Sequence, residues 1–223
     1  MIDLELFTLT LESDRPIAGS AAQLRGYFAT KFNEYILLHH HDADALVYRY
    51  PLVQYKIIDG TPTVIGINEG SDLLKEIYHL SPSIRLGEAE YRIVRRGIDV
   101  RQVPFGLDGT FHSYDFVTPW LALNQENYHA FYRARSADER HDLLRRTLAG
   151  NLLSMSKSLG YQVPDRIRSE VDVRPLKQRL KNVNVMAFAG MFHVNFQIPD
   201  YLGIGKSVSR GFGTVRQILP DGS

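Results

Sequence analysis

The first thirty residues carry two different hydrophobic patterns, one after the other. Residues 2–12 alternate apolar and polar side chains, which is the period of a half-buried β-strand. Residues 18–32 instead carry apolar side chains at helical spacing, and Gly19 and Ser20 offer a start for a helix. The chain is therefore predicted to open with a strand followed by a helix.

The next sixty residues continue the alternation of strands and helices. Extended runs at 52–58 and 63–67 flank the tight-turn pair Asp59–Gly60, and residues 69–80 have a helical pattern before a further extended run at 88–96. The order strand, helix, strand, strand, helix, strand predicts a ferredoxin-like fold, which is an antiparallel sheet with both helices on one face.

The second half is less regular but has the same kinds of element. Ser136 and Glu139 form a capping-box pattern at the start of the longest predicted helix. The predicted elements are a strand at 111–120, helices at 124–133 and 136–159, an extended stretch at 183–198 and a strand at 214–219. We interpret this half as a second, degenerate ferredoxin-like copy, which makes an α+β protein with domains at 1–105 and 106–223.

Composition narrows the class of protein. The chain has 223 residues, of which 44% are hydrophobic and 23% charged, so it is long enough for two small domains with real cores. It has no cysteine, which excludes disulfides, thiolate nucleophiles and cysteine-ligated zinc. No apolar run reaches the roughly 20 residues that span a bilayer. We expect a soluble, cytoplasmic protein that does not enter membranes.

The net charge of +1 conceals an uneven distribution of charge along the chain. Basic residues outnumber acidic ones between residues 133 and 181, which is typical of a surface that binds a polyanion. A solvated, charged helix surface is the alternative. The basic residues of this region are Arg133, Arg135, Arg140, Arg145, Arg146, Lys157, Arg166, Arg168, Arg174, Lys177, Arg179 and Lys181.

A glycine-rich, basic segment near the C-terminus is the clearest motif. Glycines allow the backbone to approach a phosphate, and interleaved basic side chains neutralise its charge. A nucleotide-binding P-loop would need glycine at Asp200, and a dinucleotide-binding loop would need one at Val208, so neither motif is present. A tight glycine-rich turn between strands stays open as an alternative. The candidate phosphate-binding residues are Gly203, Gly205, Lys206, Ser207, Arg210, Gly211 and Gly213.

The segment from Gly203 to Val215 resembles the glycine-rich loop of the RAMP superfamily, and most closely that of its CRISPR-associated repeat-processing endoribonucleases. The resemblance implies two tandem ferredoxin-like (RRM-like) domains. It also implies metal-independent cleavage, with the RNA 2′-hydroxyl as nucleophile and a 2′,3′-cyclic phosphate and a 5′-hydroxyl as products. No cofactor is implied. CRISPR repeat RNA is the implied partner, and other CRISPR effector subunits and a homodimer stay open.

Three consecutive histidines follow the first predicted helix. In the endoribonuclease family a general acid/base histidine commonly lies in this connection, and imidazole has the pKa that such a role needs near neutral pH. In an extended segment His39 and His41 project to the same side, so we assign them as the acid/base pair, in an order that the sequence leaves open. A polar surface loop is one alternative. A metal-dependent HD phosphohydrolase is another, although that class is all-helical.

Further site residues rest on the resemblance. Family members often complete the catalytic site with a tyrosine from the first helix and a lysine after the histidine. Tyr27 or Tyr35 and Lys56 occupy compatible stretches, so Tyr27 and Lys56 are the further catalytic candidates. The RNA-binding candidates outside the glycine-rich segment are Arg145, Arg146, Arg166 and Arg168, with Arg133 and Arg135 beside them. A non-catalytic RAMP subunit that holds guide RNA is the competing function, and the histidines distinguish the two because a binder does not need them.

Overall fold

The computed structural model describes residues 1–32, 49–79, 82–180 and 183–219. The chain forms two compact units. The N-terminal unit comprises Asp3–Val103 and Val208–Gly211, and the C-terminal unit comprises Met1–Ile2, Pro104–Ser207 and Phe212–Ser223.

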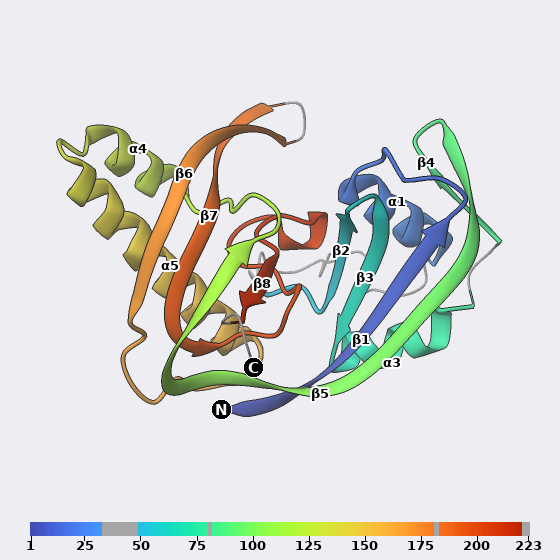
Figure 1. Ribbon diagram of the computed structural model, residues 1–223, viewed down its shortest axis with the longest axis horizontal. Coiled ribbons are helices and arrows are strands. Elements are labelled where there is room, and N and C mark those ends of the chain that lie inside the picture. The colour runs from blue at the N-terminus through green and yellow to red at the C-terminus, as the bar shows by residue number, and fades with distance from the viewer. Residues whose placement is uncertain (33–48, 80–81, 181–182, 220–223) are drawn as a thin grey trace, which may run out of the picture. The chain divides into compact units, whose positions relative to one another are not determined.

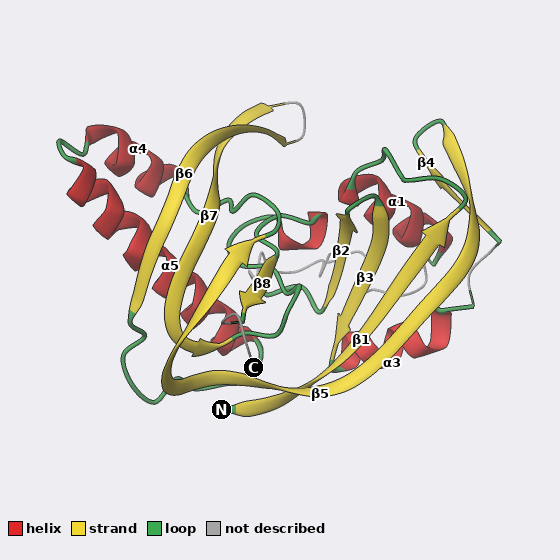
Figure 2. Cartoon of the chain, viewed as in Figure 1, coloured by secondary structure: helices red, strands yellow, loops and turns green. Residues whose placement is uncertain are grey.

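The N-terminal unit contains the predicted succession of strands and helices (Figures 1 and 2). Its elements are β1 (Ile2–Ser13), α1 (Ala21–Lys31), β2 (Val53–Ile58), β3 (Thr61–Ile67), α3 (Glu69–Ile77), β4 (Ser83–Leu86) and the first part of β5 (Ala89–Phe116). The strands lie in the order β2-β3-β1-β5, with β3 antiparallel to both of its neighbours. The ferredoxin-like prediction for this half is confirmed.

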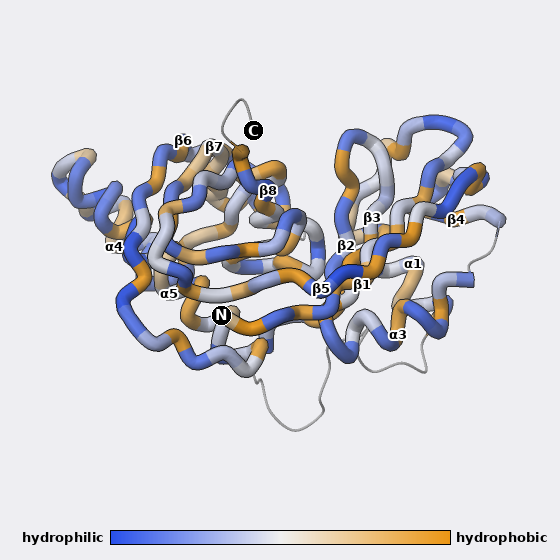
Figure 3. The backbone as a smooth tube through the Cα atoms, turned by 60° about the horizontal axis from the view of Figure 1, so that its bottom comes forward, coloured by the Kyte–Doolittle hydropathy of each residue, from blue (hydrophilic) through white to orange (hydrophobic). Residues whose placement is uncertain are grey.

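The alternation along β1 explains why both helices cover one face of this sheet. Phe7, Leu9 and Leu11 point to the same side of the strand and are almost fully buried. They share one hydrophobic cluster with residues of α1, such as Phe28, and of α3, such as Leu74. Burying each such side chain stabilises the fold by about 1.5–3 kcal/mol. Figure 3 shows hydrophobic and hydrophilic segments in turn along β1 and β5.

The C-terminal unit repeats the strand order with one helix replaced. It contains the end of β5, α4 (Gln125–Arg133), α5 (Ala137–Ser158), β6 (Ser169–Leu180), β7 (Val183–Gln197) and β8 (Val215–Ile218). β7 lies between β6 and β5, and β8 pairs with β5 on its other edge. Where the first copy has α3, the second has the glycine-rich segment. This half is therefore a degenerate ferredoxin-like copy, as predicted.

The start of α5 follows the predicted capping pattern. The hydroxyl of Ser136 accepts a hydrogen bond from the backbone N–H of Glu139 at 3.1 Å, and the Glu139 carboxylate accepts one from the N–H of Arg135 at 2.7 Å. Leu148 and Leu152 on the inner side of the helix are fully buried. Capping and burial together fix where this helix begins and which side it presents to the sheet.

Two sequence-based assignments are wrong. The segments 88–96 and 111–120 were predicted as separate strands, but they belong to β5, which runs unbroken over 28 residues and ends at Phe116. Gly97, Pro104 and Gly106 interrupt its alternation, which hid the continuity. β6 was missed because its outer half is mostly charged and contains Pro175.

Over the ranges that the structure describes, no helix is both long and apolar enough to cross a membrane.

Candidate functional site

The histidine pair lies outside the described residues. His39 and His41 fall within residues 33–48, in the connection between α1 and β2, and so does Tyr35. The described elements on either side of that connection are α1 and β2, and residues 208–210 of the glycine-rich segment, which belong to the same unit, pack against both.

Two glycines of the glycine-rich segment are required by close packing. At Gly205, where φ is +90°, a β-carbon would lie 2.7 Å from the indole Nε1 of Trp120. At Gly211, where φ is +85°, it would lie 2.6 Å from the side chain of Ala21. Gly203, Gly211 and Gly213 are buried. These glycines shape the turn, and the half-buried Lys206, Ser207 and Arg210 are left as the groups that can reach a phosphate.

Residues 208–211 belong to the N-terminal unit and pack against its first helix. The short 3₁₀ helix η1 (Val208–Arg210) lies against α1 and β2, and Val208 is buried there. This packing places Arg210 close enough to Arg25 of α1 for their charges to interact. The glycine-rich pattern indicates Arg210, but no sequence pattern indicates Arg25, which is separated from Arg210 by most of the chain.

The environment of Arg25 is electrostatically unusual. Partial burial lowers the pKa of its guanidinium, and the neighbouring positive charge of Arg210 lowers it further, while Tyr55 acts in the opposite direction. An arginine nevertheless stays protonated at neutral pH. Two guanidinium groups held together repel each other, and an anion bound beside both would lower that repulsion. This corner of the N-terminal unit is therefore suited to a phosphate.

Lys56 lies on β2 but points away from α1. Its neighbour Tyr55 belongs to the cluster under the helices, so the alternation of the strand directs Lys56 to the opposite face of the sheet. The Lys56 side chain is 0% exposed, and its ammonium donates a hydrogen bond to Gln54 Oε1 at 3.2 Å. Burial lowers the pKa of Lys56 to about 7. In this conformation the ammonium group does not face solvent.

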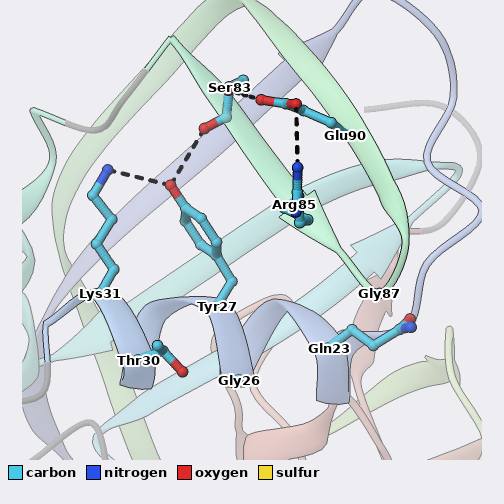
Figure 4. Close-up of a pocket in the computed structure, with 9 residues that line it drawn as sticks. All are labelled: Gln23, Gly26, Tyr27, Thr30, Lys31, Ser83, Arg85, Gly87 and Glu90. Carbon is cyan, nitrogen blue, oxygen red and sulfur yellow. Dashed lines mark hydrogen bonds and ion pairs between the residues drawn. The ribbon is translucent and has the colours of Figure 1, made fainter.

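Tyr27 lies on the other flank of α1 from Arg25, because two residues correspond to about 200° of helical rotation. Its hydroxyl donates to the carbonyl of Ser83 and accepts from the ammonium of Lys31, both at 3.3 Å (Figure 4). Tyr27 and Lys56 are thus on opposite faces of the sheet. The structure brings together Arg25 and Arg210, but it does not bring Tyr27 together with Lys56.

The basic candidates of the C-terminal unit have different surroundings. Arg145 and Arg146 on α5 both pair with the carboxylate of Asp142, at 2.6 and 3.2 Å, which also lowers the pKa of that carboxyl. Their charge is therefore already shared with an acid on their own helix, which was the alternative interpretation of this basic region. Pairs of this kind on a surface contribute little to stability.

Arg166 and Arg168 precede β6 and are exposed. Their backbone is fixed by the buried amide of Asn195, which accepts a hydrogen bond from the N–H of Arg168 at 2.7 Å and donates one to the carbonyl of Arg166 at 3.3 Å. The guanidinium of Arg168 lies 5.5 Å from the centre of the Phe111 ring. This stretch holds two exposed cations on a rigid backbone, whereas Asn195 is structural.

Sequence profiles of two domains match almost the whole chain. The profile of the Cas6b N-terminal domain matches residues 2–104, and that of the Cas6b C-terminal domain matches residues 106–218. An uncharacterized protein of Methanocaldococcus jannaschii, MJ0978, is 39% identical over 129 residues, which cover 57% of this chain and 87% of that protein.

Solved structures of the same family are similar over nearly the full length. A crystal structure of Cas6b has a TM-score of 0.89 and 36% identity, and the match covers 97% of this chain and 100% of that one. A second structure, described as the CRISPR RNA processing endoribonuclease Cas6b, has a TM-score of 0.77 and 34% identity, with the same coverage. A Cas6 product complex at 16% identity, with a TM-score of 0.62 over 96% of this chain and 100% of that one, shares the fold.

Proposed function

Because this chain belongs to the Cas6b family of CRISPR RNA-processing endoribonucleases, we propose that it cuts CRISPR repeat RNA into guide RNAs without a metal ion. The 2′-hydroxyl of one nucleotide attacks the adjacent phosphorus, and the bond from phosphorus to the 5′-oxygen breaks. One product ends in a 2′,3′-cyclic phosphate and the other begins with a 5′-hydroxyl. A base removes the 2′ proton and an acid protonates the 5′-oxygen, so no water or cofactor is consumed.

His39 and His41 are the proposed acid and base. Imidazole exchanges a proton near neutral pH, and each such group typically contributes about 10²–10⁴-fold to the rate. Support comes from the residue type and from the position in the connection between α1 and β2, within the range that the Cas6b N-terminal profile matches. In this proposal residues 1–105 form the domain that carries the histidines, and residues 106–223 form the second domain.

The observation that carries the proposal is the pair of Arg25 and Arg210 beside the glycine-rich segment. Negative charge grows on the phosphorane oxygens in the transition state, and fixed cations stabilise it most effectively where they are partly desolvated. Burial and mutual repulsion both act on Arg25, which supports an anion-binding role. Lys206, whose pKa is also lowered by burial, and Ser207 are proposed as further contacts to RNA phosphates.

The remaining site candidates take supporting roles in the proposal. Lys56 is a positioning residue, because its buried ammonium lies on the strand against which Gly211 packs. Tyr27 contacts RNA on the far flank of α1. The exposed cations Arg166 and Arg168 bind the RNA backbone, and the acid-paired Arg145 and Arg146 add only weakly. The four glycines, Gly203, Gly205, Gly211 and Gly213, shape the loop that presents Lys206 and Arg210.

Single-turnover cleavage of a repeat RNA, measured alongside the Kd, distinguishes effects on catalysis from effects on binding. His39→Ala and His41→Ala should each slow cleavage by at least about tenfold while the Kd stays nearly unchanged. Arg25→Ala should both slow cleavage and weaken binding, because it removes a phosphate contact. It should raise the Kd and reduce the slope of log Kd against log salt by about one.

The pattern across these variants decides between the two functions. If both histidine variants cut at the wild-type rate, the histidine assignment is wrong. If the wild-type protein binds repeat RNA but never cuts it, the chain is a non-catalytic subunit that holds guide RNA.

A further inference from the structure

An open pocket lies on the flank of α1 that faces away from Arg25. Its volume is about 650 Å³, which is within the range of pockets that hold small ligands. One wall is α1 and the other is the hairpin of β4 and β5 (Figure 4). The lining residues are Gln23, Gly26, Tyr27, Thr30 and Lys31 from α1, and Ser83, Arg85, Gly87 and Glu90 from the hairpin.

The side chain of Gln23 is oriented by the cap of its own helix. Its Oε1 accepts hydrogen bonds from the backbone N–H and the hydroxyl of Ser20, at 2.8 and 3.2 Å. Because the oxygen is fixed in this way, the amide nitrogen must point toward the hairpin, where a β-carbon on Gly87 would lie 2.8 Å from it. The pocket therefore contains a donor that needs no reorganisation to bind an acceptor.

The charges of the lining favour an anion. Lys31 and Arg85 are cationic, and the single carboxylate, that of Glu90, already accepts a hydrogen bond from the hydroxyl of Ser83. Arg85 reaches that carboxylate only at 3.8 Å, and its side chain is 71% exposed. With the Gln23 amide and the Thr30 hydroxyl, the lining offers more donors than acceptors, which suits phosphate and carbonyl oxygens.

We propose that this pocket binds one unpaired nucleotide of the RNA, with its phosphate between Lys31 and Arg85 and its base toward Gln23. This rests on the proposed function, because it extends the RNA past the site at Arg25 and Arg210 to the opposite flank of α1. A single nucleotide fits a concave pocket of this volume, whereas the rod-like backbone of a duplex presents a convex surface. The pocket therefore binds single-stranded RNA that flanks the cleavage site.

Two substitutions of different kinds test the pocket with a fluorescently labelled repeat RNA. Arg85→Glu reverses one charge and should raise the Kd about tenfold and reduce the salt slope by about one. Arg101→Glu is the matched control, because Arg101 is similarly exposed, at 67%, is also paired with an acid, and does not line the pocket. It should change the Kd by less than about twofold.

The second substitution fills the pocket without changing its charge. A β-carbon at Gly26 has no atom within 4 Å, so larger side chains fit on α1 and raise its helix propensity. Gly26→Ala and then Gly26→Leu should raise the Kd progressively while leaving the unfolding temperature equal or higher. Wild-type affinity in Gly26→Leu, or equal losses in Arg85→Glu and Arg101→Glu, would overturn the pocket assignment. Cleavage of repeat RNA by the wild-type protein is measured separately. The proposed function is therefore retained if only the pocket assignment is overturned.

Discussion

At the scale of single residues, Lys56 is the group whose surroundings say most about its role. A fully buried ammonium is stable only when its neighbours compensate for the lost hydration. The Oε1 of Gln54 accepts one hydrogen bond from the Lys56 ammonium. Burial nevertheless lowers its pKa to about 7. A lysine in this state holds structure in place and is poorly placed to meet RNA.

This depressed pKa predicts a specific dependence of stability on pH. In the unfolded chain Lys56 has its ordinary pKa of about 10.4, so between pH 7 and 10 the unfolded state binds more protons than the folded one. Stability therefore rises with pH, by up to about 1.4 kcal/mol per unit. The unfolding temperature of wild type relative to Lys56→Met should rise by several degrees from about pH 7 to about pH 9.

Lys75→Met is the control for that measurement. Lys75 is exposed, and its pKa is raised by the hydrogen bond to Glu5. A raised pKa contributes stability that is lost only above the ordinary lysine value, so its difference from wild type should stay flat over the same range. A flat difference for Lys56→Met would show that Lys56 stays protonated throughout, contrary to this account.

Candidate site residues could be selected from the sequence only where the type of residue was itself informative, and their roles stay predictions. Arg210 and the histidines stood out because basic groups among glycines and imidazoles in a row are rare patterns. Arg25 did not, because a single arginine between buried Leu24 and Phe28 is indistinguishable from an ordinary helix-flank residue. Its partner lies 185 positions further along the chain, and only packing brings the two together.

At the scale of elements, the contact of η1 with α1 determines where Arg210 lies. Gly211 directly follows this short helix and has φ of +85°, a backbone conformation that residues other than glycine rarely adopt. A β-carbon there would also meet Ala21 and the Tyr55 carbonyl, at 2.6 and 3.1 Å. The glycine therefore allows the segment to pack closely enough on α1 for Arg210 to reach Arg25.

Gly211→Ala should destabilise the protein by about 1–3 kcal/mol, because it adds both backbone strain and overlap. It should also weaken RNA binding, since Arg210 moves with η1. Gly150→Ala on α5 is the matched control, because no atom lies within 4 Å of its β-carbon and alanine favours a helix. That variant should be more stable by roughly 0.5–1 kcal/mol. Chemical denaturation measures both, and equal stability of the two variants would contradict the packing argument.

The elements themselves were predicted well where one face of the element is buried. β1 and α5 have clear periodicity and were located within a few residues of their observed bounds. β5 and β6 were not, because side chains on both faces are exposed along parts of them, such as Val94 and Arg95 of β5. Without a buried face there is no alternation to read from the sequence.

At the scale of the whole molecule, the chain contains two copies of a related fold that differ in the segment between their third and fourth strands. Both copies have the same strand order, and β5 serves as the last strand of the first copy and the first strand of the second. The helix that the second copy lacks is replaced by the glycine-rich segment, which supplies Lys206 and Arg210. The proposed RNA-binding loop thus lies where the second copy has no counterpart of α3.

The chemistry proposed for the whole protein is tested most directly by the ends of its products. Repeat RNA is incubated with the full chain in excess EDTA, and the fragments are analysed by mass spectrometry. The account predicts cleavage at one position in the repeat, with a 2′,3′-cyclic phosphate on the upstream fragment and a 5′-hydroxyl on the downstream one. Cleavage that EDTA abolishes, or an upstream fragment that ends in a 3′-hydroxyl, would contradict it.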